Sequence, residues 1–282
     1  MFEEVFVRSF DGCRLRLFVA GNGSKYVVFL HGWPGFWKDW EKVMPLLVND
    51  CKMVVPDLRG FGLSDKPETP DRYTLDDYAG DVLSILSTLN IDRVVLSGFD
   101  VGSSVAAYFA KNHPNKVSKL ILINPSYPSL GRKRLELEHA AENWYQFFHV
   151  LDLAEKLVGY NRDTVKIYLT HFYRHWSYRQ DAFTEKDIEE YVDIYYKHGL
   201  KGGFNWYRAR MKTRYGDWLK GPVTTLGVIV WSDRDPIFPL EWSHGAKDYF
   251  PNSELVTIRE CGHFVPREAP SELASIIREH LL

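Results

Sequence analysis

Residues 94–102 read Val-Val-Leu-Ser-Gly-Phe-Asp-Val-Gly, an apolar strand pattern that ends in a glycine-flanked turn around Asp100. The residues from Val101 to Ala110 then show helical periodicity. Glycines on both sides of a residue at a strand-to-helix turn relieve backbone crowding, so the central side chain is held out at the carboxyl edge of a sheet. The segment therefore predicts a strand, a sharp turn and a helix. Asp100 is either a candidate nucleophile or, in the simpler interpretation, the N-cap of that helix.

On both sides of this turn, short β-rich runs alternate with helical periodicity, which is typical of a parallel or mixed sheet with helices on its faces. The predicted strands cover 4–10, 14–20, 26–31, 52–56, 93–97, 117–123, 223–231 and 254–258. The predicted helices cover 39–48, 75–89, 101–112, 134–150, 151–158, 163–174, 185–198, 204–215, 240–249 and 270–282. No strand is predicted between 126 and 220. The fold class is therefore α/β, with a core domain formed by residues 1–125 and 221–282 and an inserted helical cap domain at 126–220.

The composition of the 282 residues is ordinary except for its aromatic content. The formal net charge is −2 without a long run of one sign, which argues against nucleic acid and membrane surfaces as partners. The three cysteines have no CxxC spacing, and no apolar stretch approaches the length of a membrane span. The first residues lack the basic and apolar regions of a signal peptide, so we expect a cytoplasmic protein, monomeric or homodimeric. Aromatic residues make up 15% of the chain, and 11 of the 16 tyrosines lie between residues 126 and 220.

Two loops near the C-terminus carry the residues that a nucleophilic aspartate needs as partners. Residues 231–236 read Trp-Ser-Asp-Arg-Asp-Pro, and residues 261–264 read Cys-Gly-His-Phe. Each loop follows a predicted strand, so the chain order is nucleophile, acid, histidine. His263 is the candidate base, and both Asp233 and Asp235 are candidate acids.

An earlier loop, His31-Gly32-Trp33-Pro34-Gly35, also follows a predicted strand. Such a loop can direct a backbone N–H group at a developing oxyanion, and a second N–H group comes from the residue after the nucleophile. The predicted oxyanion hole therefore consists of the N–H groups of Trp33 and Val101. His31 is expected to be a hydrogen-bonded structural residue rather than a base, and Asp57 and Arg59 are expected to brace their loop.

Together these motifs resemble those of the α/β-hydrolase superfamily, over essentially the whole chain. An aspartate at the turn resembles the epoxide hydrolase and haloalkane dehalogenase branch, because esterases carry serine there. The pattern of a small residue, two spacers and an aspartate in residues 232–235 is similar to that of the family's acid and favours Asp235.

Two segments of the predicted cap resemble the tyrosine segments of epoxide hydrolases. They are Asn205-Trp206-Tyr207-Arg208 and Asn143-Trp144-Tyr145-Gln146. A phenol is neutral at pH 7 and can protonate a nascent alkoxide, which suits opening of an epoxide ring. The resemblance implies that Tyr145 and Tyr207 act as acids and that substrate contacts Trp33, Tyr145, Trp206, Tyr207 and Phe264.

The resemblance implies a cofactor-independent epoxide hydrolase without a metal, which converts apolar epoxides to vicinal diols with water as co-substrate. The predicted route runs through an alkyl ester on Asp100 that is hydrolysed with the help of His263 and Asp235. Val101 departs from the family, in which Trp usually follows the nucleophile. Three alternatives stay open: a haloalkane dehalogenase with the same three residues, a non-catalytic protein that binds a small ligand, and, less favoured because of Asp100, an esterase or lactonase.

Overall fold

The structure is a computed structural model that describes residues 2–211 and 217–281. An eight-stranded sheet has the order β1-β2-β4-β3-β5-β6-β7-β8. Its strands are β1 (Glu3–Arg8), β2 (Arg14–Ala20), β3 (Tyr26–Leu30), β4 (Lys52–Pro56), β5 (Val94–Phe99), β6 (Val117–Ile123), β7 (Gly227–Ser232) and β8 (Ser253–Ile258). β2 pairs antiparallel with both β1 and β4. The strands β4, β3, β5, β6, β7 and β8, which follow one another in the sheet, are all parallel. This is the predicted mostly parallel α/β sheet.

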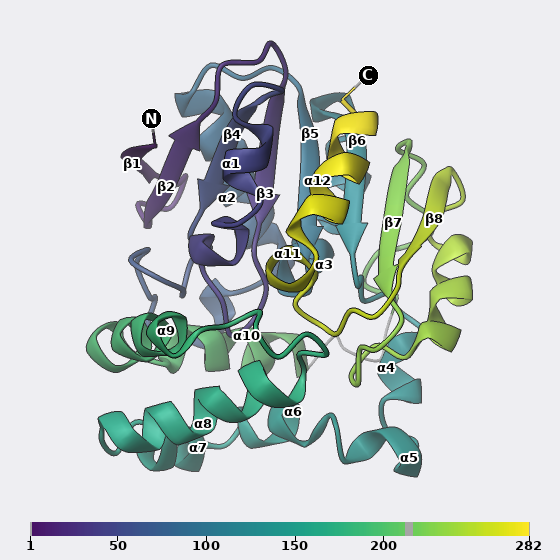
Figure 1. Cartoon of the computed structure of the whole chain (residues 1–282). Coiled ribbons are helices and arrows are strands. Elements are labelled where there is room, and N and C mark those ends of the chain that lie inside the picture. The colour runs from purple at the N-terminus through teal and green to yellow at the C-terminus, as the bar shows by residue number, and fades with distance from the viewer. Residues whose placement is uncertain (1, 212–216, 282) are drawn as a thin grey trace.

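Helices cover both faces of the sheet (Figure 1). α1 (Met44–Leu47), α11 (Val265–Glu268) and α12 (Pro270–Glu279) lie in front of it, and α2 (Leu75–Thr88) and α3 (Val101–Asn112) lie behind it. Four 3₁₀ helices complete the sheet domain: η1 (Trp37–Trp40), η2 (Pro70–Arg72), η3 (Pro114–Lys116) and η4 (Leu240–Asp248). β5 is buried along its whole length, as expected for a central strand of a sheet covered on two sides.

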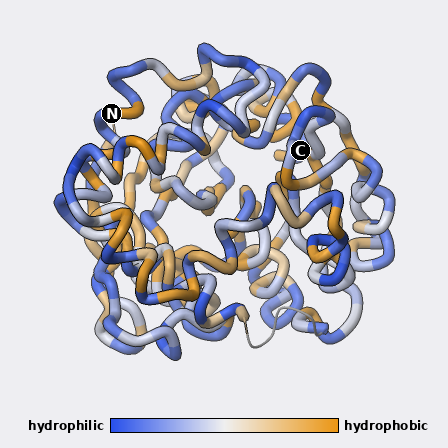
Figure 2. Tube along the Cα trace, turned by 90° about the horizontal axis from the view of Figure 1, so that it is seen from below, coloured by the Kyte–Doolittle hydropathy of each residue, from blue (hydrophilic) through white to orange (hydrophobic). Residues whose placement is uncertain are grey.

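An inserted helical region lies between β6 and β7, beneath the carboxyl ends of the parallel strands (Figure 1). It comprises α4 (Leu130–Lys133), α5 (Leu137–Ala140), α6 (Trp144–Phe148), α7 (Asp152–Val158), α8 (Arg162–His175), α9 (Glu185–His198) and α10 (Lys201–Met211). Capping boxes begin α8 at Asn161 and α9 at Thr184. Hydrophobic and hydrophilic residues alternate every few positions along much of the trace (Figure 2), as amphipathic helices require.

Four predicted elements differ clearly from the structure. The helix predicted at 39–48 is instead the 3₁₀ helix η1, which ends at Trp40, followed by the short helix α1, which begins at Met44. The single helix predicted at 134–150 is divided into α5 and α6, and at the division the backbone N–H and the side chain of Asn143 both donate to the carbonyl of His139. The strand predicted from Val223 begins only at Gly227, since the Val223 N–H donates to Tyr249 outside the sheet. The segment at 240–248 is 3₁₀ rather than α-helical. The last residues of the helix predicted at 204–215 lie outside the described residues.

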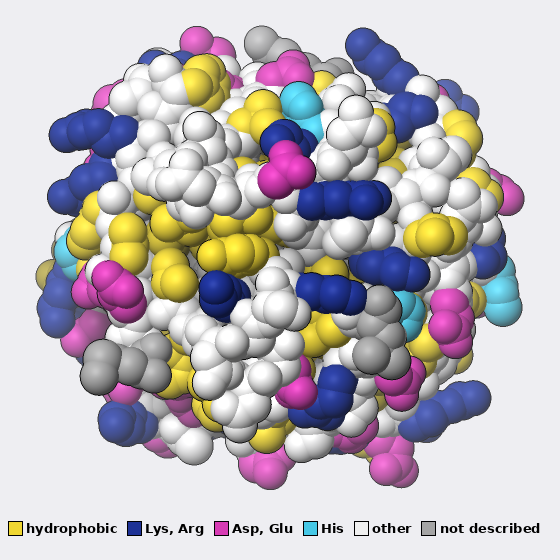
Figure 3. Space-filling model, turned by 90° about the horizontal axis from the view of Figure 1, so that it is seen from above, with side chains coloured by type: hydrophobic (Ala, Val, Ile, Leu, Met, Phe, Trp, Pro, Cys, Tyr) yellow, Lys and Arg dark blue, Asp and Glu magenta, His cyan; other side chains and the backbone are white. Residues whose placement is uncertain are grey.

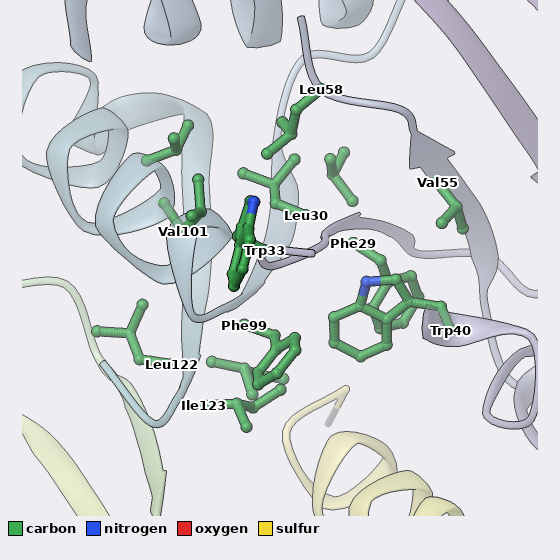
Figure 4. Packing of buried hydrophobic residues seen from close by; sticks show 14 of the residues in the cluster. Phe29, Leu30, Trp33, Trp40, Val55, Leu58, Phe99, Val101, Leu122 and Ile123 are labelled. Carbon is green, nitrogen blue, oxygen red and sulfur yellow. The ribbon is translucent and has the colours of Figure 1, made fainter. Parts of the chain in front are cut away.

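The buried core is one continuous cluster that runs from the sheet into the inserted helices. Figure 4 shows its part around the end of β5, where Trp33, Phe99 and Val101 pack among aliphatic side chains. The face that points away from the inserted helices carries charged side chains of both signs (Figure 3), in agreement with the small net charge. Among the described residues, no helix combines the length and apolar character needed to cross a bilayer.

Candidate active site

Asp100 occupies the sharp turn between β5 and α3. Its backbone has φ 51° and ψ −111°, a conformation that is strained for a residue with a Cβ atom. The two flanking glycines make this turn possible. A Cβ on Gly98 would lie 2.2 Å from the carbonyl oxygen of Gly102, and one on Gly102 would lie 2.3 Å from that of Leu30. The Asp100 side chain forms no capping hydrogen bond with α3, so the simpler interpretation as a side-chain N-cap is wrong.

The carboxylate of Asp100 is held by backbone N–H groups. Trp33 N–H donates to Oδ1 over 2.8 Å, and a second hydrogen bond comes from the N–H of Val101. Burial raises the pKa of Asp100 above its usual range, whereas the charges of His263 and Arg134 and the two N–H groups act in the opposite direction. The two predicted oxyanion donors thus both bind the Asp100 carboxylate, Trp33 through Oδ1.

His263 lies fully buried beside Asp100, with its Nε2 atom 3.8 Å from Oδ2. Its Nδ1 atom lies 2.7 Å from Oδ2 of Asp235, and Oδ1 of Asp235 accepts hydrogen bonds from the N–H groups of Ile237 and Phe238. Burial lowers the pKa of His263, but the charge of Asp235 and its hydrogen bond outweigh burial, so the net shift is upward. Among the described residues, Nε2 has no hydrogen-bond partner. A neutral imidazole with a free nitrogen beside a carboxylate has the geometry that a general base requires.

Asp233, the other candidate acid, is not bonded to His263. It accepts a hydrogen bond of 3.4 Å from the N–H of Cys261 and lies 3.8 Å from the guanidinium of Arg259. The structure therefore joins His263 to Asp235 rather than Asp233.

Two tyrosines of the inserted region face this group. The ring of Tyr145 stacks on Trp33 with centroids 5.2 Å apart, and the ring of Tyr207 lies edge-on to Tyr145 at 5.7 Å. Burial is the main reason why the pKa of Tyr207 lies well above its usual value, and the nearby Tyr145 and Asp100 raise it further. Tyr207 consequently remains a neutral phenol that can donate a proton.

Asp100, Tyr145 and Tyr207 line one cavity of about 50 Å³, room for a few water molecules. Trp206 lines it as well, whereas Trp33 and Phe264 are absent from its described lining. Phe264 packs against Trp176 and Phe183 instead. The other described lining residues are Val101, Ser104, Ser126, Tyr127, Gly131, Arg134, Gln146, Arg210, Trp218 and Phe238.

The upstream loop residues have the expected structural contacts. His31 is buried, accepts a hydrogen bond from the N–H of Leu58, and has its pKa lowered to about 4 by burial. Asp57 accepts from the N–H groups of Trp37 and Leu63. Arg59 is bound to Asp81 and Asp11. These residues brace the loop, as the sequence indicates.

Metal-binding geometry occurs in one group of the described residues, Glu136, Glu138 and His139. The two glutamates are exposed, and none of the three belongs to the described lining of the cavity. Exposed carboxylates of this kind need no ion, so the group adds nothing to the chemistry at Asp100.

Sequence reasoning missed several residues of the site. Asn124, at the end of β6, donates to Oδ2 of Asp235 over 2.9 Å and to the carbonyl of His263 over 3.2 Å. Its position after a buried strand, beside the other catalytic candidates, is the signal that could have found it. Gln146 donates to the hydroxyl of Tyr145 over 3.0 Å and follows it directly in the sequence. No sequence motif marks Arg134 or Arg210, and only the fold places them at the cavity.

Comparison with known proteins agrees with this architecture. The model of the alpha/beta hydrolase fold family matches residues 25–270. The chain is 32% identical over 271 residues to the soluble epoxide hydrolase of Corynebacterium sp. (strain C12), covering 92% of this chain and 91% of that protein. It is 27% identical to the AB hydrolase superfamily protein YfhM of Bacillus subtilis (strain 168), over 96% and 95% of the two chains.

The solved structure of epoxide hydrolase CorEH without ligand is 27% identical, with a TM-score of 0.84 over 99% of this chain and 97% of that one. The matches thus extend over the sheet and the inserted helices alike. The chain belongs to the alpha/beta hydrolase superfamily and is related to its epoxide hydrolases.

Proposed function

We propose that the protein is an epoxide hydrolase that converts small epoxides to vicinal diols through a covalent ester on Asp100. The observation that carries this proposal is the placement of Asp100 and two tyrosines on one cavity, with His263 directly behind the carboxylate. An epoxide needs a nucleophile for its carbon and a proton donor for its oxygen, and this cavity offers both.

In the first step, Oδ2 of Asp100 attacks an epoxide carbon and the carbon–oxygen bond of the ring breaks. The departing oxygen takes a proton from Tyr145 or Tyr207, which leaves a β-hydroxyalkyl ester on Asp100. Oδ1 stays bonded to the N–H group of Trp33, while the N–H group of Val101 keeps its hydrogen bond to the same carboxyl group, so Oδ1 becomes the carbonyl oxygen of that ester.

In the second step, His263 takes a proton from water through Nε2 while the water oxygen attacks the ester carbonyl. The negative charge on the carbonyl oxygen rests on the same two N–H groups. Collapse of this intermediate breaks the bond to the alcohol oxygen, which receives the proton back from His263. The vicinal diol leaves and Asp100 is released as the carboxylic acid. Its proton returns to the tyrosinate formed in the first step, which regenerates the Asp100 carboxylate and the neutral phenol.

The tyrosines favour an epoxide over a haloalkane as substrate. A departing halide needs a hydrogen bond but no proton, whereas an alkoxide needs the proton that a neutral phenol supplies. Aromatic side chains at Trp206, Trp218 and Phe238 provide apolar surface for the rest of the substrate. This surface supports the apolar character expected from the sequence.

A single turnover in water enriched in oxygen-18 tests the ester route. With enzyme in excess over styrene oxide, we expect unlabelled diol, because the added oxygen comes from the Asp100 carboxylate. Repeated turnovers then place label in the peptide that contains Asp100. Direct attack of water on the epoxide would instead label the diol in the first turnover and leave Asp100 unlabelled, which would refute the route.

A further inference from the structure

Arg134 is a buried cation in the wall of the candidate active-site cavity. It follows the last turn of α4, is 9% exposed, and lines the cavity together with Asp100 and Tyr207. Its Nε atom has no hydrogen-bond partner among the described residues, and no carboxylate of those residues lies within ion-pair distance of its guanidinium. Neither step of the proposed reaction involves the positive charge of Arg134.

A buried guanidinium nitrogen without a hydrogen-bond partner is unfavourable, because arginine stays protonated and the lost hydration of that nitrogen must be replaced. The ring of Phe238, 4.5 Å from the Arg134 guanidinium carbon, provides a partial replacement through its π face. The charge of Arg134 also lowers the pKa of Asp100, although the two groups form no ion pair. Formation of the ester would neutralise Asp100 and remove this distant countercharge.

We infer that the substrate is an epoxide bearing a carboxylate, and that Arg134 binds this carboxylate. The inference rests on the proposed function and names its substrate class. A planar guanidinium pairs with a carboxylate through two parallel hydrogen bonds, which would satisfy the Arg134 donors in the cavity. The apolar epoxide expected from the aromatic surface therefore carries an acidic substituent.

The lining of the cavity adds a second arginine to this end of the site. The guanidinium of Arg210 stacks between Trp206 and Trp218, at 5.5 and 4.8 Å from their rings. Among the described lining residues, two arginines and one aspartate thus face the same space, which favours an anionic ligand. The small volume of the cavity indicates a short acid, with few bonds between the carboxylate and the ring.

The test compares short epoxy acids with their primary amides, which have nearly the same shape but no charge. The acids carry the carboxylate directly on the oxirane or separated from it by one or two methylene groups. We expect the wild-type protein to prefer one acid over its amide in kcat/KM. In Arg134→Met this ratio should fall about 10- to 100-fold, the effect of losing a charge-assisted contact.

Two further variants serve as controls for the change in the acid-to-amide ratio of Arg134→Met. Arg132→Met removes an exposed arginine of the same helix and should leave the ratio unchanged. Arg134→Lys keeps the charge without the planar fork and should recover part of the preference. Because both substrates are measured on the same preparation, a loss of folded protein cannot change the ratio.

Several outcomes would overturn the inference while leaving the epoxide hydrolase proposal intact. One is turnover of amides and styrene oxide without a preference for any acid. Another is an equal loss for acid and amide in Arg134→Met, which would mean that Arg134 acts only through Asp100. If neither acids nor neutral epoxides react, the proposed function fails, and calorimetry with 3,4-dihydroxybutanoate then decides the inference. Binding to the wild type and Arg132→Met but not Arg134→Met supports the anion site, and any other pattern refutes it.

Discussion

The carboxyl edge of the sheet and the inserted helices hold their chemical groups in different ways. Asp100 and Asp235 are fixed by backbone N–H groups of strand-end loops, and His263 is fixed by Asp235. Tyr145 is surrounded by rings, with Trp33, Phe172 and Trp176 all within 5.5 Å between centroids, and its hydroxyl also accepts a hydrogen bond from Gln146. Hydrogen bonds define directions closely, whereas ring packing allows small adjustments.

The difference suggests a division of labour. Under the proposed function, the edge of the sheet supplies the groups for nucleophilic attack and ester hydrolysis, and the inserted helices supply the proton donors and the shape of the cavity. The two regions are nevertheless joined closely. The hydroxyl of Tyr173 donates to the carbonyl of Pro34 over 2.6 Å, and the N–H of His263 donates to the carbonyl of Trp176 over 2.8 Å.

The largest expected effect comes from Asp100→Ala, which removes the nucleophile. We expect turnover to fall by roughly 10⁴-fold or more, since no other described group of the cavity can form the ester. A steady-state assay of diol formation measures it. Asp233→Asn is the matched control because it changes a carboxylate of the neighbouring loop and should retain activity. Equal losses in the two variants would contradict the assignment.

Asp235→Asn should slow ester hydrolysis by roughly 10³- to 10⁴-fold, because His263 loses the partner that orients it. The pH dependence should change as well. His263 acts in its neutral form, so hydrolysis fails as the pH drops below its raised pKa. Removal of the Asp235 charge lowers that pKa, so the acid limb of the profile should move to lower pH. Single-turnover decay of the ester measures this limb, and a limb that stays in place would show that another group sets it.

Tyr207→Phe tests the inserted helices, because it removes one phenolic proton and keeps the ring packing. We expect the rate of ester formation to fall by roughly 10²-fold, with Tyr145→Phe similar and the double variant lower still. Rapid-quench measurement of the ester separates this step from hydrolysis. Tyr196→Phe, on an exposed ring, serves as control. If the double variant formed the ester at the wild-type rate, another group would have to donate the proton.

The smallest effect is expected for Asn124→Ala, which leaves the contacts of Asp235 and of Ser232 unsatisfied. We expect the free energy of unfolding to fall by about 1–3 kcal/mol. Urea titration measures it, with the exposed Asn115→Ala expected within about 0.5 kcal/mol of the wild type. A neutral result for Asn124→Ala would mean that this network holds geometry without adding stability.

The sheet and the Asp100 turn could be predicted because local patterns define them. Gly98 is required by its contact with Gly102 within the turn, and β5 begins with the apolar run 94–96, although the residue that requires Gly102 is the distant Leu30. The proximity of Asp100, Asp235 and His263 could be predicted because each follows a parallel strand, and the carboxyl ends of parallel strands meet at one edge of the sheet. The structure places Asp235 and His263 together, as predicted.

The remaining features depend on distant packing. Asn143 lies at the break in a segment whose periodicity reads as one helix, and its side chain bonds to the backbone of the preceding turn. Arg134 reaches the cavity only through the path of α4 and α5 beneath the sheet, and Phe264 turns toward Trp176 instead of the cavity. A sequence alone contains no local signal for these placements.

The most direct test of the central claim is the intact mass of His263→Ala after incubation with epoxides and haloalkanes. This variant can form the ester but lacks the base that hydrolyses it. We predict a stable adduct equal in mass to one whole epoxide, located by peptide mapping on Asp100. An adduct formed only from a haloalkane, with loss of hydrogen halide, would make the protein a dehalogenase. Absence of any adduct, with epoxides still converted to diols, would contradict the ester mechanism altogether.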